Sequence, residues 1–196
     1  MRQKTPGGND GLKIIGMKKK RFIVLVDFSE YAPNLLTYAH QWSRSAFAEL
    51  VLVHETMVLI PGISDYETRI NLAEHANEDA LEQLKAMARK TLPPDAEVTY
   101  EVSDRPIRRI LVDLLKEDYE HLVFVGVKGT GLLKKIFIGS VAVQLIDHTD
   151  NTVVAIPQDI SQYSHEKIFI AVSARHPINM PQLHNFLKFI DERAPL

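Results

Sequence analysis

Five short runs with the character of β-strands, most of them apolar, are separated by segments of helical periodicity and constrain the fold of this chain more than any other feature. The runs occupy residues 22–26, 50–53, 97–102, 122–125 and 152–156. Most of them lack the polar–apolar alternation of a strand with one solvent-facing side. The absence of this alternation is typical of strands that are buried on both faces. Such strands, joined by helices, form parallel sheets. The pattern predicts an α/β, Rossmann-like fold in which helices cover both faces of a five-stranded parallel sheet.

The segments between these runs predict four helices. The first follows Ser29, whose residue type favours helix N-caps, and buries a face that includes Trp42. The second covers about residues 69–90, the third begins after Pro106, and the fourth lies near residues 140–147. Because each helix lies between two predicted strands, each provides the crossover that a parallel pair of strands requires.

Three glycines follow the fourth predicted strand with a spacing that favours anion binding. Gly126, Gly129 and Gly139 form the skeleton G-x2-G-x9-G, and Ser140 follows at the start of the fourth predicted helix. Glycines let backbone N–H groups approach a phosphate, and the partial positive charge of a helix N-terminus favours the anion. We interpret residues 126–140 as a phosphate-binding loop; glycines that only permit tight turns are the alternative.

The composition excludes several classes of site. The chain of 196 residues has no cysteine, which rules out disulfides, thiolate metal sites and thiol catalysis. Its formal net charge of -2 argues against a dedicated nucleic-acid-binding protein. No apolar run approaches the roughly 20 residues that span a membrane, and the N-terminal segment makes a poor signal peptide. We therefore expect a cytoplasmic protein that binds neither nucleic acid nor membrane.

Both ends of the chain differ from the central unit. Residues 1–17 have little apolar periodicity, and we interpret them as a disordered leader before a domain over residues 18–158. Further on, residues 167–173 repeat the apolar pattern of the first strand, and residues 183–190 repeat the apolar pattern of the first helix. We interpret residues 159–196 as a linker plus the first strand and helix of an incomplete second copy. An appendage that packs on the first domain is the alternative.

These features together resemble the universal stress protein family over residues about 20–157. The run Val26-Asp27-Phe28-Ser29-Glu30 resembles the family's first strand and turn, and His54 ends the second strand as the family's usual histidine does. The pattern Gly126-x2-Gly129-x9-Gly139-Ser140 matches the nucleotide-binding signature of the family's ATP-binding branch. The resemblance implies a stress-response or regulatory module that binds ATP with Mg²⁺ and hydrolyses it slowly or not at all. It also implies a homodimer, or a pseudo-dimer with a second domain.

The resemblance further assigns ligand contacts to particular residues. It implies that Asp27 lies at the adenosine end, that the backbone of Glu55 holds the adenine edge, and that Gly126 approaches the ribose. The later glycines and the residues after them would line the phosphates. The complete set of expected nucleotide-binding residues is Val26, Asp27, Phe28, Glu55, Gly126, Lys128, Gly129, Thr130, Gly139, Ser140 and Val141. No catalytic residue and no metal-ligating residue is expected.

Two positions depart from the family pattern. The residue at the adenine edge is usually apolar, whereas here it is the charged Glu55. The loop after the third strand often has a glycine near its proline, and here it reads Ser103-Asp104-Arg105-Pro106. That loop either narrows the pocket or adds the cation of Arg105 to it.

Two other functions are compatible with the sequence. A dimeric scaffold of the same fold that binds no nucleotide would accommodate Glu55. An ATP-using enzyme, such as an ATP pyrophosphatase, fits less well, because the S-G-G-x-D-S loop of those enzymes is replaced by Asp27-Phe28-Ser29-Glu30-Tyr31. The chain also has no G-x4-G-K-[ST] loop of the kind that vigorous ATPases use.

Overall fold

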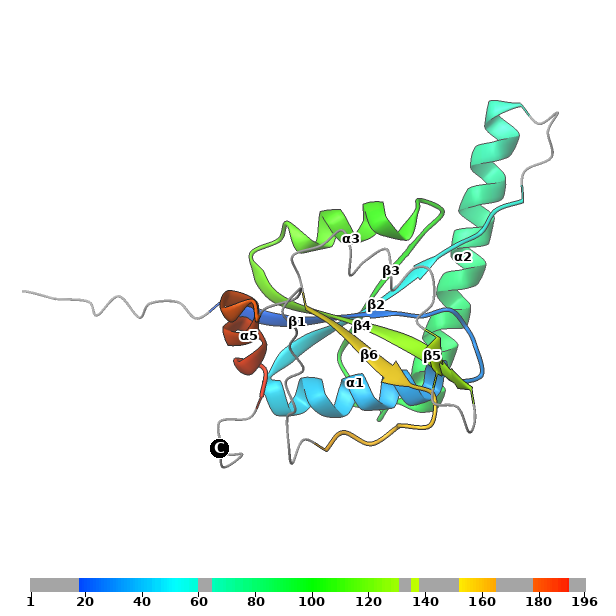
Figure 1. The fold of residues 1–196 in the computed structure, drawn as a ribbon. Helices are drawn as coiled ribbons and strands as arrows, with labels where there is room; N and C mark the ends of the chain where they lie inside the picture. The colour runs from blue at the N-terminus through cyan, green and yellow to red at the C-terminus, as the bar shows by residue number, and fades with distance from the viewer. Residues whose placement is uncertain (1–17, 60–64, 131–134, 138–151, 165–177, 191–196) are drawn as a thin grey trace, which may run out of the picture.

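A computed structural model of the chain describes residues 18–59, 65–130, 135–137, 152–164 and 178–190. Within them, five strands form a parallel sheet in the order β3-β2-β1-β4-β6 (Figure 1). The strands are β1 (Lys19–Leu25), β2 (Ala48–Glu55), β3 (Val98–Ser103), β4 (Tyr119–Thr130) and β6 (Thr152–Pro157). The prediction of a five-stranded parallel α/β sheet is therefore confirmed.

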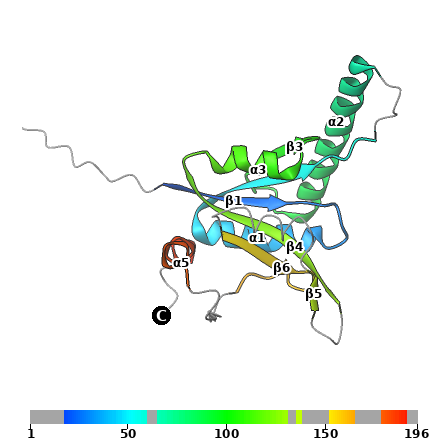
Figure 2. The same ribbon diagram turned by 45° about the horizontal axis from the view of Figure 1, so that its top comes forward.

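Alternate residues of the central strands face two separate hydrophobic cores. Helices α1 (Ala32–Ala46) and α2 (Tyr66–Thr91) cover one face of the sheet, and α3 (Ile107–Leu115) lies on the other (Figures 1 and 2). On β1, Phe22 and Val24 pack into the core beneath α1, whereas Ile23 packs into the core beneath α3. Each such side chain, fully removed from water, contributes about 1.5–3 kcal/mol. This burial on both faces explains why the central strands read as continuous apolar runs.

The first helix begins later than the sequence suggests. It starts at Ala32, its N-cap is Tyr31, and Pro33 occupies the first turn, where a fixed φ suits a helix. The carbonyl of Ser29 accepts a hydrogen bond from Ala32 N at 3.1 Å, so Ser29 lies in the turn that precedes the helix. The prediction that the Ser29 side chain caps α1 is therefore wrong.

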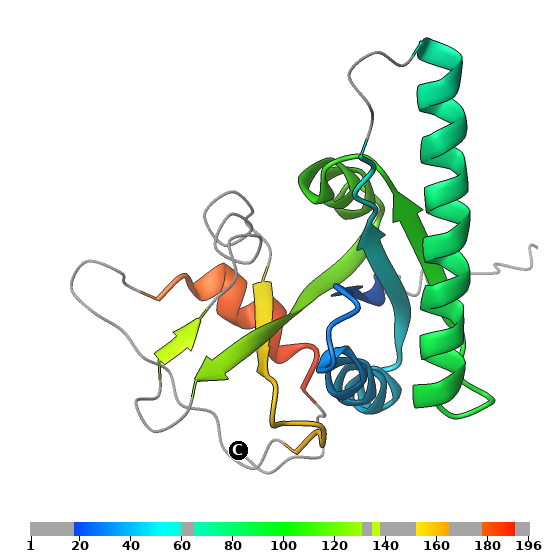
Figure 3. The same ribbon diagram turned by 90° about the vertical axis from the view of Figure 1, so that its right-hand side faces the viewer.

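Helix α2 is longer than predicted and projects beyond the sheet (Figures 1 and 3). Its N-cap is Asp65, whose Oδ1 accepts a hydrogen bond from Thr68 N at 2.7 Å. This cap moves the start of the helix from the predicted residue 69 to Tyr66. None of the described helices, α2 included, is long and apolar enough to cross a membrane.

The predicted boundary between the fourth strand and the glycine loop is wrong. Strand β4 continues past Val125 to Thr130, where it pairs with the short antiparallel strand β5 (Lys135–Phe137). Residues 126–130 are thus strand rather than loop, because Gly126 and Val127 pair with β6 and residues 128–130 pair with residues 135–137 of β5. The helix predicted near residues 140–147 lies outside the described residues.

The C-terminal part of the chain packs on the first domain. The predicted helical stretch, residues 183–190, overlaps α5 (Met180–Leu187), and the turn after this helix places Phe189 in the same core as Trp42, with only 1% of Phe189 exposed. The Trp42 indole Nε1 donates a hydrogen bond to the Phe189 carbonyl at 2.8 Å, and Tyr163 stacks on Trp42 with ring centroids 5.3 Å apart. The predicted repeat strand and the predicted leader, residues 1–17, lie outside the described residues, so the second-copy interpretation stays a prediction.

Two partly or fully buried histidines make stability sensitive to mild acid. Burial lowers the pKa of the His121 imidazole, and the neighbouring Arg21 cation lowers it further. Burial, followed by Arg44, lowers the pKa of His40 in the same way. The unfolded chain therefore binds more protons than the folded chain as pH falls through the ordinary histidine value of about 6.5. Stability is expected to be complete above that value and to be lost as pH falls from it toward the folded-state pKa values.

Urea unfolding between about pH 7.5 and pH 5.5 measures this loss above the range in which carboxylates titrate. In His121→Phe the loss across this interval should be smaller than in the wild-type protein. An identical pH dependence in the two proteins would show that His121 is not a source of the acid sensitivity.

Candidate functional site

A pocket of about 270 Å³ lies at the carboxyl ends of β1, β4 and β6. From β1 the chain crosses to β2 on one side, whereas the strand beside β1 on its other side is β4. Open α/β sheets bind ligands at such a switch point, outside the carboxyl ends of the strands. The pocket is lined by Asp27, Ser29, Tyr31, Ala32, Leu35, Gly126, Val127, Ile156, Pro157 and Gln158.

The turn between β1 and α1 fixes an acidic side chain at this pocket. Phe28 adopts a left-handed backbone conformation, with φ of 55°, which is uncommon for a bulky residue and turns the chain sharply after Asp27. Asp27 Oδ1 accepts a hydrogen bond from Ser29 N at 3.0 Å. Within the described residues the second carboxylate oxygen of Asp27 has no partner, so it can accept a hydrogen bond from a ligand.

Gly126 opens the other wall of the pocket. It belongs to β4, pairs with Ile156 of β6, and is exposed although Val125 and Val127 beside it are buried. A Cβ built on Gly126 would meet nothing nearer than Leu35 Cδ2, at 3.8 Å. Within the part of the chain that the structure describes, the space that a Cβ would occupy is therefore free of close protein atoms, and the β4 backbone at Gly126 is accessible to a ligand.

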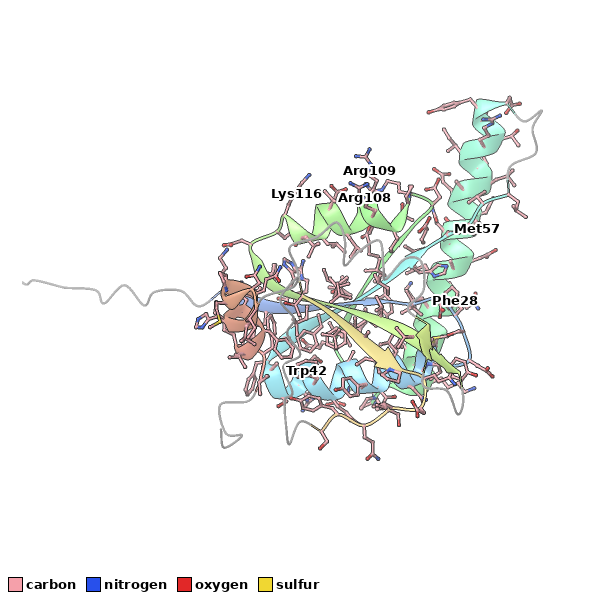
Figure 4. All side chains as sticks on the ribbon, viewed as in Figure 1. Phe28, Trp42, Met57, Arg108, Arg109 and Lys116 are labelled. Atoms are coloured by element: carbon pink, nitrogen blue, oxygen red, sulfur yellow. The ribbon has the colours of Figure 1, made fainter. Side chains whose placement is uncertain are left out.

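Val26 and Phe28, two of the predicted ligand contacts, stabilise the strand ends beside the pocket. Val26 N donates to Val53 O at 2.9 Å, and Val26 O lies 2.7 Å from His54 Nδ1. Because a carbonyl oxygen can only accept, Nδ1 of His54 carries the hydrogen. The Phe28 ring, labelled in Figure 4, lies 4.2 Å from the His54 ring between centroids. These contacts hold the ends of β1 and β2 together, and neither Val26 nor Phe28 lines the pocket.

Glu55, the main departure from the family pattern, caps a helix. Its Oε2 accepts a hydrogen bond at 2.9 Å from the backbone N–H of Ile107, the first residue of α3. The N-cap residue Pro106 makes no side-chain hydrogen bond to this helix, so Glu55 supplies the acceptor and places a negative charge at the helix N-terminus. The negative charge of Glu55 therefore has a structural role at the N-terminus of α3.

The loop before α3 also directs its charge away from the pocket. Arg105 Nη1 donates to Asp113 Oδ2 at 2.8 Å, and Arg105 N donates to Ser103 Oγ at 3.2 Å. The guanidinium is therefore bound to α3 itself. Neither Glu55 nor Arg105 belongs to the residues that line the pocket.

Removing the Glu55 carboxylate is expected to destabilise the fold without weakening ligand binding. Glu55→Ala leaves the first N–H of α3 without its partner, which should cost about 1 kcal/mol in the free energy of unfolding. Glu55→Gln keeps an acceptor oxygen at this position and should lose less. Urea unfolding and nucleotide titration of both variants test the assignment. Unchanged stability in Glu55→Ala, or a large loss of nucleotide affinity, would contradict it.

The structure brings only some of the predicted nucleotide-binding residues together. The pocket brings Asp27 and Gly126 together, while the backbones of Lys128, Gly129 and Thr130 lie further along β4, where it pairs with β5. Gly139, Ser140 and Val141 lie outside the described residues. No cluster of three or more potential metal ligands occurs in the part of the chain that the structure describes.

Sequence reasoning missed several residues that line the pocket. Tyr31 and Leu35 come from the start of α1, and Gln158 follows directly on β6. The Asn34 amide holds the segment after β6 against α1 by donating to Gln158 O at 2.7 Å. Their position in the sequence could have identified these residues, because residues that immediately follow parallel strands gather at one edge of the sheet.

Comparisons with known proteins identify the family of the chain. Residues 19–157 match the model of the universal stress protein family. A universal stress protein structure from Archaeoglobus fulgidus is 21% identical over 69% of this chain and 97% of that chain, with a TM-score of 0.48. The structure of the Archaeoglobus fulgidus universal stress protein in complex with dAMP is 22% identical over 71% of this chain and 98% of that chain, with a TM-score of 0.47. A universal stress protein from Lactobacillus plantarum is 21% identical over 72% of this chain and 99% of that chain, with a TM-score of 0.44.

No curated protein matches the chain. The family match nevertheless covers well over half of it, from the first residue of β1 to the last residue of β6. The chain belongs to the universal stress protein family.

Proposed function

We propose that the pocket binds ATP and that the protein acts as a nucleotide-holding regulatory or stress-response module. The observation that carries the proposal is the meeting of Asp27 and Gly126 at the switch point between β1 and β4. A carboxylate at a strand end accepts hydrogen bonds from ribose hydroxyls, as in other nucleotide-binding α/β folds. A glycine opposite it lets the sugar and the first phosphate approach the backbone.

The chemistry of the pocket favours retention of ATP over rapid hydrolysis. Asp27 is the sole carboxylate among the residues that line the pocket, and the chain lacks the G-x4-G-K-[ST] loop. Magnesium is commonly held by the phosphates together with one or two carboxylates. Mg²⁺ would therefore enter with the nucleotide, bound to its phosphates.

The scaffold alternative rested on the charge of Glu55 and on the unusual loop Ser103-Asp104-Arg105-Pro106, whose Arg105 is bound to Asp113 of α3. Since the Glu55 carboxylate accepts a hydrogen bond from the first residue of α3, its charge is accounted for by the fold. The charge is no longer an argument against nucleotide binding, and we retain ATP binding as the proposed function.

Nucleotide release and calorimetry test the proposal. Purified protein is denatured and the supernatant is analysed for adenine nucleotide, while protein freed of nucleotide is titrated with ATP and Mg²⁺. We expect one ATP per chain, weaker binding of GTP, and little ADP after prolonged incubation. Protein that releases no nucleotide and gives no heat with ATP would refute ATP binding. Rapid ADP formation would refute the holding role alone.

A further inference from the structure

A short segment after β6 connects the nucleotide pocket to the aromatic core beneath α1. A turn closed by a hydrogen bond from Ile160 N to Pro157 O, at 3.1 Å, follows directly on β6. Residues 158–163, which we call the strap, then follow α1 in the direction of the helix chain (gold below α1 in Figure 1). The strap thus begins at the pocket, beside the start of α1, and reaches Trp42 in the last turns of that helix.

Contacts with α1 hold the strap at its two ends. At the first end, Asn34 Nδ2 donates a hydrogen bond to Gln158 O at 2.7 Å. At the second end, Tyr163 N donates to Gln41 Oε1 at 2.8 Å, and the Tyr163 ring stacks on Trp42 with the ring centroids 5.3 Å apart. The residues between the two ends are mostly exposed. Because so little of the strap is buried, its detachment from α1 is a local event that leaves the sheet intact.

The second end of the strap belongs to one aromatic cluster with the segment around α5. Tyr163 lies edge-on to Tyr38, with ring centroids 5.8 Å apart, and stacks on Trp42. Phe186 packs edge-on against the same indole, with ring centroids 6.1 Å apart, and the indole Nε1 donates to Phe189 O. The strap and the segment around α5 therefore share Trp42, so that the packing of each supports the packing of the other.

Gln158, the first residue of the strap, also forms part of the pocket wall. It lines the pocket together with Pro157 of β6 and Leu35 of α1. Pro157 pairs with Val127 and is fixed by the sheet, whereas Gln158 lies beyond the last paired residue of β6. The place of Gln158 at the pocket therefore depends on its contact with Asn34 and on the docking of the strap.

We propose that ATP binding and docking of the strap on α1 are coupled, so that bound ATP holds the strap in place and detachment of the strap weakens ATP binding. This regulation rests on the proposed function, since the pocket must hold the nucleotide. A nucleotide that fills the pocket contacts Gln158 only while the strap is docked, and it therefore binds the docked state more tightly. Linkage makes the two effects equal in size, and we expect a factor of roughly ten.

Amide hydrogen exchange of the wild-type protein measures the effect of ATP on the strap. The Tyr163 N–H is bound to Gln41 Oε1 while the strap is docked, so its exchange reports detachment. Saturating ATP with Mg²⁺ should slow this exchange roughly tenfold. The Ala96 N–H, which donates to Pro93 O in the turn before β3, provides the control and should exchange at the same rate with and without ATP.

Tyr163→Ala measures the effect of the strap on ATP. Tyr163 does not line the pocket, and its truncation removes the ring that stacks on Trp42. Calorimetric titration should show an affinity for ATP that is roughly tenfold lower. Tyr163→Phe keeps the stacked ring and should retain most of the affinity, whereas Asn34→Ala releases the first end of the strap and should lower the affinity as well. Tyr100→Ala truncates a half-buried aromatic side chain on β3, far from the strap, and should leave the affinity unchanged.

The outcomes separate the coupling from the proposed function. Circular dichroism verifies that each variant is folded, and the exchange measurement on the wild-type protein needs no variant. If ATP binds but leaves the exchange of the Tyr163 N–H unchanged, or binds Tyr163→Ala as tightly as the wild-type protein, the coupling is overturned and the proposed function stands. An equal loss of affinity in Tyr100→Ala would also overturn the coupling, because general destabilisation would then explain the effect. A wild-type protein that binds no ATP would overturn both.

Discussion

Gly126→Val is expected to lower the affinity for ATP by roughly 10- to 100-fold while leaving the fold intact. Among the described residues, a Cβ at this position meets only Leu35 Cδ2, at the ordinary contact distance of 3.8 Å, so we expect the fold to accept the valine. Its two methyl groups then occupy space that we assign to the ligand, and overpacking of this kind costs about 1–3 kcal/mol. Because valine is favoured in strands, the free energy of unfolding should not decrease. Calorimetric titration with ATP and Mg²⁺ and urea unfolding measure the two quantities.

Two further variants serve as controls for Gly126→Val. Gly126→Ala adds one methyl group and should weaken binding less than valine does. Thr99→Val places a β-branched apolar residue at an exposed position of β3, remote from the pocket, and should leave the affinity unchanged. If Gly126→Val folds normally and binds ATP as tightly as the wild-type protein, the nucleotide does not lie between β1 and β4.

The second large effect is expected in stability, because Phe189 completes the core beneath α1. Its ring lies 5.7 Å from that of Phe22 between centroids, and 1% of the residue is exposed. Phe189→Ala removes the ring from a site bounded by strands and helix that cannot collapse fully. The expected loss in the free energy of unfolding is about 3–5 kcal/mol, as for other buried phenylalanines. Urea unfolding followed by circular dichroism measures it.

Leu187→Ala provides the matched control on the same segment. Leu187 is 42% exposed, so its truncation should cost much less than that of Phe189. Equal and small losses in the two variants would mean that the C-terminal segment is not part of the core in solution. Deletion of residues 159–196 should destabilise the domain at least as much as Phe189→Ala, since it also removes Tyr163 from Trp42.

Local patterns in the sequence were sufficient to predict the sheet. Strands β1, β2 and β4 are buried on both faces, so their apolar runs stand out without any knowledge of their partners. The end of β4 could not be placed in the same way. Its extension to Thr130 depends on pairing with β5, and this pairing is determined by hydrogen bonds between separate segments rather than by hydrophobic periodicity.

Site residues could be predicted where their position along the chain determines where they lie in the sheet. Asp27 and Gly126 follow or end parallel strands, and the sheet topology alone brings them to one edge. The role of Glu55 was not visible, because its partner Ile107 is 52 residues away in the sequence. The burial of Phe189 was equally hidden, since the helix that precedes it has no fully buried residue of its own.

Trp42 is the single tryptophan of the chain, and it lies where the C-terminal segment meets the domain. Its indole is surrounded by the rings of Phe22, Phe124, Tyr163 and Phe186. The intrinsic fluorescence of the protein therefore reports on one junction. Detachment of the segment would admit water to the indole and shift its emission to longer wavelength while the far-ultraviolet signal of the sheet persists. The unlabelled protein thus carries its own optical probe for the order in which its two parts separate.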